Sequence, residues 1–537
     1  MTGYSSRSAR WMQVQFWNDF TGGLNNRSQR QQLAKNETPD CLDVVFNNRG
    51  GFGTRRGFTV GLSDATNLSG GYIGGQFSAG SDVLWGFNTA GNFWTWQGSG
   101  ALSVTTPTFV PVVTSRVTSA VWNSKLYFAN WFNTAGGVYK MYSWNGSAFT
   151  LLTNTSNNNY TAPTSGNAPL AKYVASHSGH MFWADTVESG VRYRSRVRWS
   201  HPLQPECFAD ADYFDIEPDD QTNQITALVP FRNMLLVFKQ RGVFAIFGYD
   251  KDTFTVERIS TQAGAAFQTA VCSTAGAVYW WSPDGNVYAY NGSSVVPIGD
   301  RISQPAIDGT ISLSSTENLA VWADNMLYVI LKTNSGSRLC YVYDPQVGRD
   351  GAWTQFSFAP TSMIWWRSPS KTGMYFTMNG YTALFDKSNL SQQFDDYTGV
   401  GGAVTPIQAY YRTAWFSSYD AGLTKRWRRP HVTVACGDDA NLHIDVYHDF
   451  QESVPLKQLV LPITNVATGA MTWYDGVTLT NSTWGTNWYS TDPGYEFKRV
   501  SSLGRSHAVQ MKVYMKDHTT MWWVDSITMP YFNKAYR

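Results

Sequence analysis

The stretch ITALVPFRNMLLVF, residues 225–238, contains two apolar runs separated by the polar pair Arg232 and Asn233. Both runs are rich in β-branched and aromatic side chains, which predicts two strands joined by a tight turn. The stretches VTSAVWNSKLYFAN (117–130) and NLAVWADNMLYVI (318–330) have the same layout. A hairpin of this kind therefore recurs along the chain.

The second run of this hairpin occurs seven times, at intervals of 43 to 55 residues. A four-stranded blade of a β-propeller occupies about 40–50 residues, so the interval predicts one blade for each run. Seven blades are preferred, although six to eight fit if the first and last units share a blade. The runs begin at Val83, Leu126, Met181, Met234, Val278, Met326 and Met374.

Several units continue into an outer hairpin, as in YSWNGSAFTLL from Tyr142 and YAYNGSSVVPIG from Tyr288. Asn-Gly between large residues is a strong hairpin signal, because both turn positions need a positive φ that these residues tolerate. The units are therefore expected to be antiparallel, and no segment shows a convincing helical period. The predicted fold class is all-β.

Aromatic residues make up 15% of the 537 residues, and charged residues also make up 15%, against about 25% charged in an average soluble domain. Aromatic side chains pack well on pleated sheets and bury a large area at interfaces. The composition therefore favours an all-β protein within a larger assembly. A net charge of +2 excludes nucleic-acid or membrane binding by the overall charge of the chain.

The five cysteines are scattered and form no CxxC pair, which argues against a disulfide framework or a structural zinc site. The N-terminal residues lack an apolar segment, and no apolar run approaches 18 residues, so neither secretion nor stable membrane insertion is expected. We expect synthesis in a cytosol. The cysteines, expected to be buried thiols, are Cys41, Cys207, Cys272, Cys340 and Cys436.

Three regions differ in pattern. Residues 1–60 are rich in Asn, Gln and Arg and predict an extended N-terminal arm, whereas residues 61–400 hold the repeated hairpins of the β-propeller. In residues 401–537, apolar residues such as Leu442 and Ile444 alternate with polar ones, as in half-buried antiparallel strands. This last region is predicted to be a C-terminal β-sandwich domain.

A possible basic stripe lies in the third unit, where four arginines occupy every second position of one predicted strand and therefore share a face. The stripe could contact phosphates, or it could pair with the acids of residues 210–220 or with a neighbouring subunit. The pairing interpretation is favoured, because few aromatic residues suited to base stacking lie nearby. The four residues are Arg192, Arg194, Arg196 and Arg198.

A second basic cluster opens the C-terminal domain and is predicted to form a contact between domains or subunits. Its residues are Lys425, Arg426, Trp427, Arg428 and Arg429.

An acidic cluster follows the basic stripe and is a candidate cation site. It lacks the glycine and the spacing of an EF-hand loop, so a solvated loop or ion pairing is the preferred interpretation. Its members are Asp210, Asp212, Asp215, Glu217, Asp219 and Asp220.

Other sequence motifs for catalysis, metal binding or phosphate binding are weak or absent. His177 and His180 form an HxxH pair, but a hairpin setting without a third nearby ligand makes zinc binding improbable. The glycine-rich residues 50–57 lack phosphate-loop spacing, and no GxSxG occurs. The sequence therefore predicts no catalytic residue, no metal and no cofactor, and the chain is not expected to be an enzyme.

The N-terminal stretch FTGGLNNRSQRQQLAKNETPDCLDVVFNNRGGFGTRRGF (20–58) resembles the opening of bacteriophage tail proteins of the β-propeller type. The similarity lies in the aromatic-Gly-Gly-Leu start at 20–24, the Asn-Glu step at 36–37, the strand at 44–46 and the Gly-to-Gly close at 53–57. The order of three further segments is also similar to that family: RVRWSHPLQPECF, the run from Asp219 to Gly248, and GNVYAYNGSSVVPIGDRI.

This resemblance implies a structural virion protein of the phage tail, assembled in the host cytoplasm. Such a protein forms a ring, often a hexamer, as a nozzle or tail-tube component through which the genome leaves, or it is a minor tail protein near the tip. The implied partners are further copies of the chain and other tail proteins (adaptor, tail tube or fibres), with DNA passing transiently and without sequence-specific binding.

The arm is expected to bury its apolar residues on an adjacent subunit during assembly. These residues are Trp11, Phe16, Trp17, Phe20 and Leu24.

Two alternatives remain open. A carbohydrate- or receptor-binding propeller at the tail tip would carry Trp and Tyr residues on exposed loops. A glycoside-cleaving enzyme would need two carboxylates about 5–10 Å apart, here in the central channel.

Overall fold

A computed structural model gives the fold of the chain. It is almost entirely β, as the repeated hairpins predict. The residues that the structure describes are 12–68, 71–78, 82–107, 116–129, 141–152, 170–367, 372–378, 381–386, 395–397, 404–417, 422–436, 440–463, 472–473, 482–483, 495–499, 503–516 and 521–533.

Seven four-stranded antiparallel sheets occur in this part of the chain, one for each predicted blade, which confirms the propeller. Each of the seven apolar runs forms the second strand of its sheet. Blades one to four consist of β8 (Tyr72–Ser78), β9 (Asp82–Phe87), β10 (Phe93–Trp96) and β11 (Ser103–Thr105); β12 (Thr118–Trp122), β13 (Lys125–Ala129), β14 (Tyr142–Trp144) and β15 (Phe149–Leu151); β16 (Leu170–His177), β17 (His180–Glu188), β18 (Val191–Trp199) and β19 (Tyr213–Asp215); and β20 (Ile225–Phe231), β21 (Met234–Lys239), β22 (Val243–Phe247) and β23 (Thr255–Ser260).

Blades five to seven complete the ring, and the seventh takes its outer strand from the beginning of the chain. Their strands are β24 (Val271–Ser273), β25 (Val278–Trp281), β26 (Val287–Tyr290) and β27 (Val295–Pro297); β28 (Leu319–Ala323), β29 (Met326–Lys332), β30 (Arg338–Asp344) and β31 (Ala352–Phe356); and β32 (Ser362–Arg367), β33 (Thr372–Met378), β34 (Tyr381–Asp386) and β7 (Thr59–Ser63).

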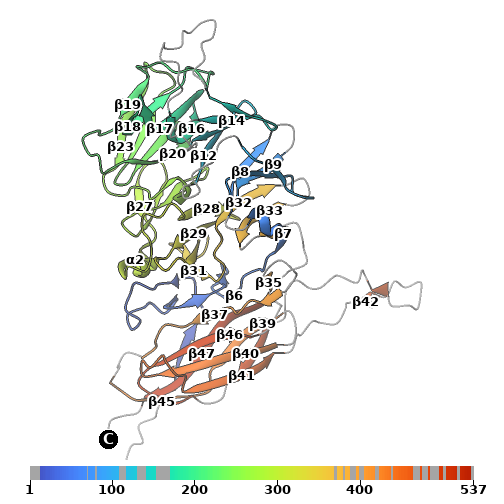
Figure 1. The fold of residues 1–537 in the computed structure, drawn as a ribbon. Coiled ribbons are helices and arrows are strands. Elements are labelled where there is room, and N and C mark those ends of the chain that lie inside the picture. The colour runs from blue at the N-terminus through green and yellow to red at the C-terminus, as the bar shows by residue number, and fades with distance from the viewer. Residues whose placement is uncertain are drawn as a thin grey trace, which may run out of the picture.

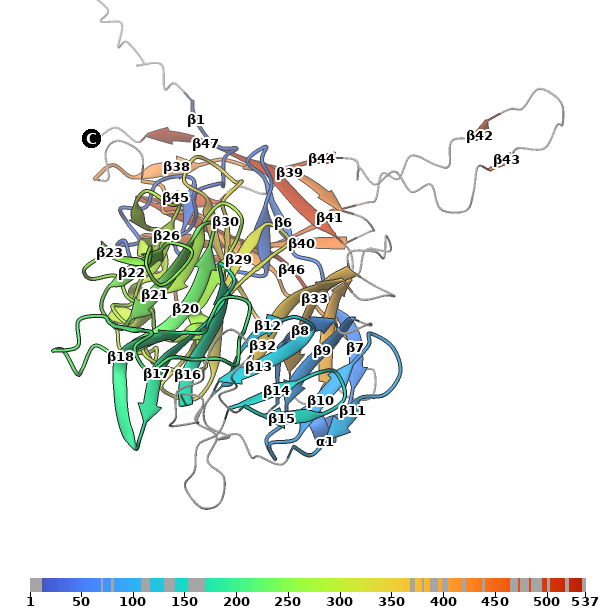
Figure 2. The ribbon, with the colours of Figure 1, turned by 90° about the horizontal axis from the view of Figure 1, so that it is seen from above.

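The ring is closed around a common axis. The inner strand of each blade contacts the inner strand of the next, and β32 of blade seven contacts β8 of blade one. Pairing of β7 with β34 joins the start of the propeller to its end, and Figure 2 shows blue β7 on the same side of the ring as gold β33 of this blade. The beginning and the end of the repeat region therefore share one blade, which was one of the alternatives that the sequence allowed.

Aromatic side chains fill the spaces between blades. Trp85 of blade one meets Phe128 of blade two edge-on at 5.3 Å between ring centroids. Trp96 of blade one meets Tyr375 of blade seven at 5.7 Å, so the closing seam is packed in the same way. Edge-to-face pairs of this kind add to the energy of simple area burial, which explains the aromatic content.

The C-terminal region forms a two-sheet β-sandwich below the propeller (Figure 1). One sheet contains β44 (Tyr495–Arg499), β39 (His431–Cys436), β47 (Trp522–Asn533), β38 (Lys425–Trp427) and β45 (Gly504–Ser506), with β1 (Gln13–Trp17) and β6 (Phe52–Thr54) beside β47 and β5 (Val44–Phe46) beside β6. The other contains β4 (Cys41–Leu42), β37 (Tyr410–Arg412), β46 (Val509–Met515), β40 (Ala440–His448) and β41 (Lys457–Ile463).

The N-terminal arm is extended, and it is docked within its own chain. β1, β5 and β6 join one sandwich sheet and β4 joins the other. The arm therefore ties the sandwich to blade six, because β2 (Gly23–Leu24), β4 and β5 also contact β31.

The remaining elements are short. They are β3 (Glu37–Thr38), which pairs with β2, β35 (Asp395–Tyr397) with β36 (Val404–Pro406), β42 (Thr472–Trp473) with β43 (Ser482–Thr483), and the helical turns α1 (Ala65–Leu68), η1 (Gln268–Ala270), η2 (Asp300–Ile302) and α2 (Gln304–Ile307). Among the residues placed, no helix has the length and apolar character needed to cross a bilayer.

Candidate functional site

The arginines of the third blade form ion pairs with acids of the same chain. Arg196 pairs with Asp215 at 2.8 Å and with Glu188 at 3.0 Å, and Arg198 pairs with Glu188 at 2.6 Å. Arg192 pairs with the buried Asp185. These guanidinium groups are therefore engaged within blade three, in line with the pairing interpretation.

The fourth arginine of the stripe is exposed, and Arg194 donates to the carbonyl oxygen of Gln221 at 3.3 Å. A register shift in β17 between Ala184 and Thr186 brings Asp185 and Glu188 to the stripe. Alternation along the strand does not predict this bulge, so Asp185 and Glu188 were not among the partners expected for the stripe, which were the acids of residues 210–220, a neighbouring subunit or phosphates.

Glu188 forms ion pairs with two of these arginines, Arg196 and Arg198. Burial alone would raise the pKa of Glu188, but hydrogen bonds from Arg198 and Thr186 and the charge of Arg196 hold the pKa below its ordinary value. A depressed folded-state pKa contributes stability above the unfolded-state pKa of about 4.3, and this stability is lost as the pH falls through the folded value.

Glu188→Gln is therefore expected to lower the free energy of unfolding by about 1.5–3 kcal/mol at pH 7, the range for hydrogen bonds to charged groups. Urea unfolding should show this difference shrinking as the pH falls below about 4.3. Asp219→Asn, a change at an exposed acid, is the control and should have little effect. A difference that stays constant down to low pH would contradict the assignment.

The remaining acids of residues 210–220 are distributed rather than convergent. Asp220 pairs with Arg241 at 3.0 Å, and Glu217 pairs with Arg258. Within the described ranges, no group of three or more His, Cys, Asp or Glu side chains is placed to hold a metal ion. His180 lies between two carbonyl oxygens, those of Ser200 at 2.6 Å and Tyr249 at 3.0 Å.

The second basic cluster alternates between the sandwich core and solvent. Lys425 is buried and donates to the carbonyl oxygens of Leu423 and His507, both at 3.0 Å. Trp427 is also buried, and its indole N–H donates to Ser506 at 2.6 Å. Their neighbours point outward: Arg426, Arg428 and Arg429 are exposed. Only these three are available to a partner.

Three of the five predicted arm residues are buried in the chain's own core. Trp17, Phe20 and Leu24 are at most 3% exposed. Phe20 packs edge-on against Tyr411 of the sandwich at 5.2 Å, so these side chains are not free for an adjacent subunit in this conformation. Phe16 is 59% exposed, and Trp11 lies outside the described residues.

Strand β1 exposes two of its three apolar residues. Val14 and Phe16 share one face of the strand with Met12, which precedes it, and the three are 38%, 59% and 58% exposed. Gln15 is 9% exposed on the opposite side, where its amide accepts from Lys35 at 3.1 Å. Trp17 is buried on that side as well, but the exposure of three apolar side chains costs hydrophobic free energy.

Arginine side chains lie beside this row of apolar residues, on the neighbouring strands of the sheet. Phe532 of β47 pairs with Arg426, which pairs with Arg505 of β45, and Met12 lies one step beyond the pair Gln13–Tyr531. Arg428 lies over the ring of Phe532 at 5.0 Å. We call this surface the outer face; it consists of Met12, Val14, Phe16, Phe532, Arg426, Arg428 and Arg505.

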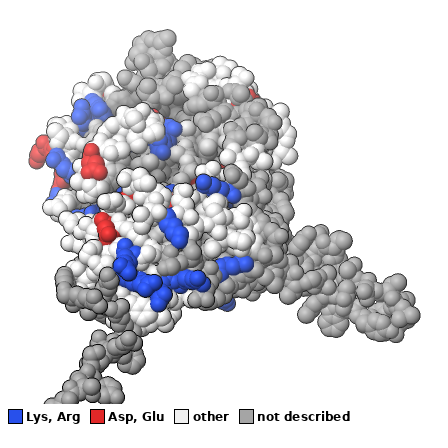
Figure 3. All heavy atoms as spheres, turned by 90° about the horizontal axis from the view of Figure 1, so that it is seen from below, with Lys and Arg blue, Asp and Glu red and all other residues white. Residues whose placement is uncertain are grey.

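The arginines of the outer face make no ion pair with any residue that the structure places. Arg426 and Arg505 stand directly opposite each other, and like charges in this position destabilise a strand pair. Seen from below, at the sandwich end of the molecule, Lys and Arg side chains form a row (Figure 3). Exposed apolar residues beside unpaired arginines are typical of a protein interface.

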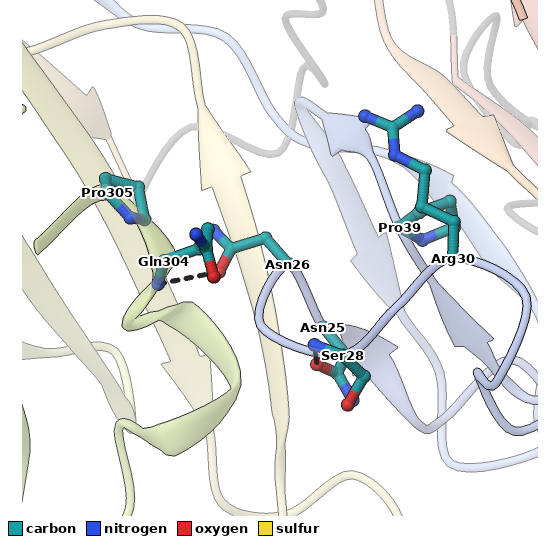
Figure 4. Close-up of a pocket in the computed structure, with 7 residues that line it drawn as sticks. All are labelled: Asn25, Asn26, Ser28, Arg30, Pro39, Gln304 and Pro305. Carbon is teal, nitrogen blue, oxygen red and sulfur yellow. Dashed lines mark hydrogen bonds between the residues drawn. The ribbon is translucent and has the colours of Figure 1, made fainter. Parts of the chain in front are cut away.

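A small pocket of about 190 Å³ lies at the seam between the arm and the propeller (Figure 4). Asn26 accepts from the backbone N–H of Gln304 at 3.3 Å across it, and Arg30 pairs with Glu452. The polar groups that line the pocket therefore form contacts of the arm with the propeller and with the sandwich. The lining residues are Asn25, Asn26, Ser28, Arg30, Pro39, Gln304 and Pro305.

The fold defines a seven-bladed β-propeller protein with a β-sandwich, and the outer face is its candidate interaction site. No protein-family profile matches the chain, and neither does any curated protein sequence. Solved structures match with probability 1.00 but with TM-scores below 0.5, so these likenesses carry no argument about function.

Three such structures are BBS1N in complex with ARL6DN, BamB from Moraxella catarrhalis and the computationally designed Ika8 protein. Their identities are 11%, 10% and 12%, and their TM-scores 0.40, 0.34 and 0.36. The alignments cover 62%, 65% and 61% of this chain, and 99%, 94% and 100% of the matched chains.

Proposed function

We propose that this chain is a structural protein of a bacteriophage tail that assembles with copies of itself into a ring, as a nozzle or tail-tube component of the conduit for genome ejection. The tail assignment rests on the resemblance of residues 20–58 and of the mid-chain segments. A non-enzymatic role in the virion follows from it, with other tail proteins as partners.

The observation that carries the assembly role is the exposed apolar row at strand β1. Exposing Met12, Val14 and Phe16 is unfavourable in an isolated chain, and a partner that covers these side chains removes the cost. The closed propeller supports the role mechanically, because each blade is held between two others. The docked arm makes propeller and sandwich a connected unit.

A glycan-binding role would need several exposed aromatic rings on the loops of the propeller. Among the described residues of the propeller, Tyr249 is the one aromatic residue that stands out as strongly exposed.

Replacing the apolar residues of β1 tests the proposal. Met12→Ser/Phe16→Ser is expected to shift wild-type multimers toward single chains in sedimentation velocity, because the apolar surface that drives association is removed. The urea midpoint should be unchanged or slightly higher, since both side chains are exposed. Val460→Ser is the matched control, because Val460 is 54% exposed on the other sandwich sheet. Equal multimer fractions in both variants would contradict the proposed role of β1.

A further inference from the structure

An acidic and apolar surface lies on the rim of blades three and four. Leu203 and Tyr249 are 73% and 75% exposed, and both flank the turn between β16 and β17. The backbone N–H of Leu203 donates to the carbonyl of Gly179 at 2.8 Å, and the carbonyl of Tyr249 meets His180 at 3.0 Å.

Carboxylates lie close to Tyr249 in the chain. Asp250 and Asp252 follow it directly and are exposed. Asp212 is half-buried, and it is close enough to Lys251, His201, Arg198 and His180 to interact with their charges. We call this surface the acidic rim; it consists of Leu203, Tyr249, Asp212, Asp250 and Asp252.

The acidic rim and the outer face are complementary in both charge and polarity. The outer face offers Arg426, Arg428 and Arg505, which form no ion pair with a described residue, beside Met12, Val14 and Phe16. The rim offers carboxylates and two exposed apolar side chains. Opposite potentials bring two surfaces together and fix their register. Arginine and aromatic residues are also the types that concentrate at the centre of interfaces.

The two surfaces lie at opposite ends of the molecule, with blades three and four at the top of Figure 1 and the sandwich at the bottom. One chain therefore cannot join its own surfaces. A contact between two different surfaces of identical chains is heterologous, and it generates a closed ring when the rotation between copies closes.

We infer that the outer face of one copy docks on the acidic rim of the next copy, in a head-to-tail contact. This inference rests on the proposed self-assembly and names its interface. Each copy in a ring then uses both surfaces, which accounts together for the arginines that form no ion pair with a described residue, the exposed apolar row at β1 and the exposed Tyr249.

A charge-swap experiment with the full chain tests the inference. The face variant Arg426→Glu/Arg428→Glu/Arg505→Glu and the rim variant Asp212→Lys/Asp252→Lys should each sediment as single chains, because each carries like charges on both surfaces. Mixing the two variants in equal amounts should restore multimers, because the reversed surfaces are again complementary. The control Arg56→Glu/Arg349→Glu/Arg367→Glu reverses three exposed arginines outside both surfaces and should sediment like the wild type.

The outcomes separate the inference from the function on which it rests. Wild-type multimers that persist in the face and rim variants would overturn the head-to-tail contact and leave self-assembly intact. Single variants that dissociate without recovery on mixing would also overturn it, since this pattern reflects damage to each surface and not complementarity. A wild type that sediments as single chains at every concentration would overturn self-assembly itself.

Discussion

Arg55→Met is expected to lower the free energy of unfolding by about 3–5 kcal/mol, the cost of leaving buried charges without their partner. Arg55 is 2% exposed and pairs with Asp43 at 2.6 Å and with Asp396 at 2.5 Å. Burial opposes its charge, but the carboxylates of Asp43 and Asp396 outweigh burial and raise the pKa of Arg55 above its ordinary value.

Arg55 also joins the arm to the propeller. Its guanidinium lies 5.5 Å from the ring centroid of Phe356, the last residue of the outer strand of blade six, and 5.0 Å from that of Phe358, which follows this strand. The variant should therefore loosen the contact between the sandwich and the propeller as well as lower the overall stability.

The adjacent arginine provides the matched control. Arg56 is exposed, so Arg56→Met should change the midpoint of urea unfolding little. Equal midpoints for the two variants would show that the Arg55 ion pairs contribute nothing to stability and would contradict the assignment.

Trp96→Ala is expected to cost about 3–5 kcal/mol, the range for removing a buried aromatic side chain. Trp96 is 3% exposed and contacts Trp366 and Tyr375 of blade seven, at 5.9 Å and 5.7 Å between ring centroids. The loss falls on the seam that closes the ring, so amide hydrogen exchange should increase most in β7 and β34.

Two further variants show how the loss of stability depends on the side chain that is removed. Trp96→Phe keeps an aromatic ring and should cost less than Trp96→Ala, whereas Val104→Ala, at an exposed position of the same blade, should cost little. An exchange pattern that rises equally in all seven blades would argue against a special closing seam.

The repeated hairpins were sufficient to predict the propeller, because their strands are long, apolar and paired with close neighbours in the chain. Val83 to Met374 mark the second strands of all seven blades. The closing strand β7 was not predictable in the same way, since it pairs with Leu384 and its neighbours, more than 300 residues away. Strands of the arm are two to five residues long, too short for a periodic signal.

The sequence predicted only part of the candidate site. The basic cluster from Lys425 was recognised, but which of its side chains face solvent depends on the pairing of β38 with β45 and β47. Met12 and Val14 were not predicted as site residues, because alternation in MQVQFW does not say which side of the strand faces the core. That side is set by the pairing of β1 with β47 and by the burial of Gln15 and Trp17.

The mass and shape of the wild-type particle test the central claim most directly. Sedimentation velocity combined with negative-stain imaging of the full chain is predicted to give a closed ring of several copies, in which the sandwich of one copy contacts blades three and four of the next. Single chains of 60.1 kDa at every concentration, without rings in the images, would contradict it.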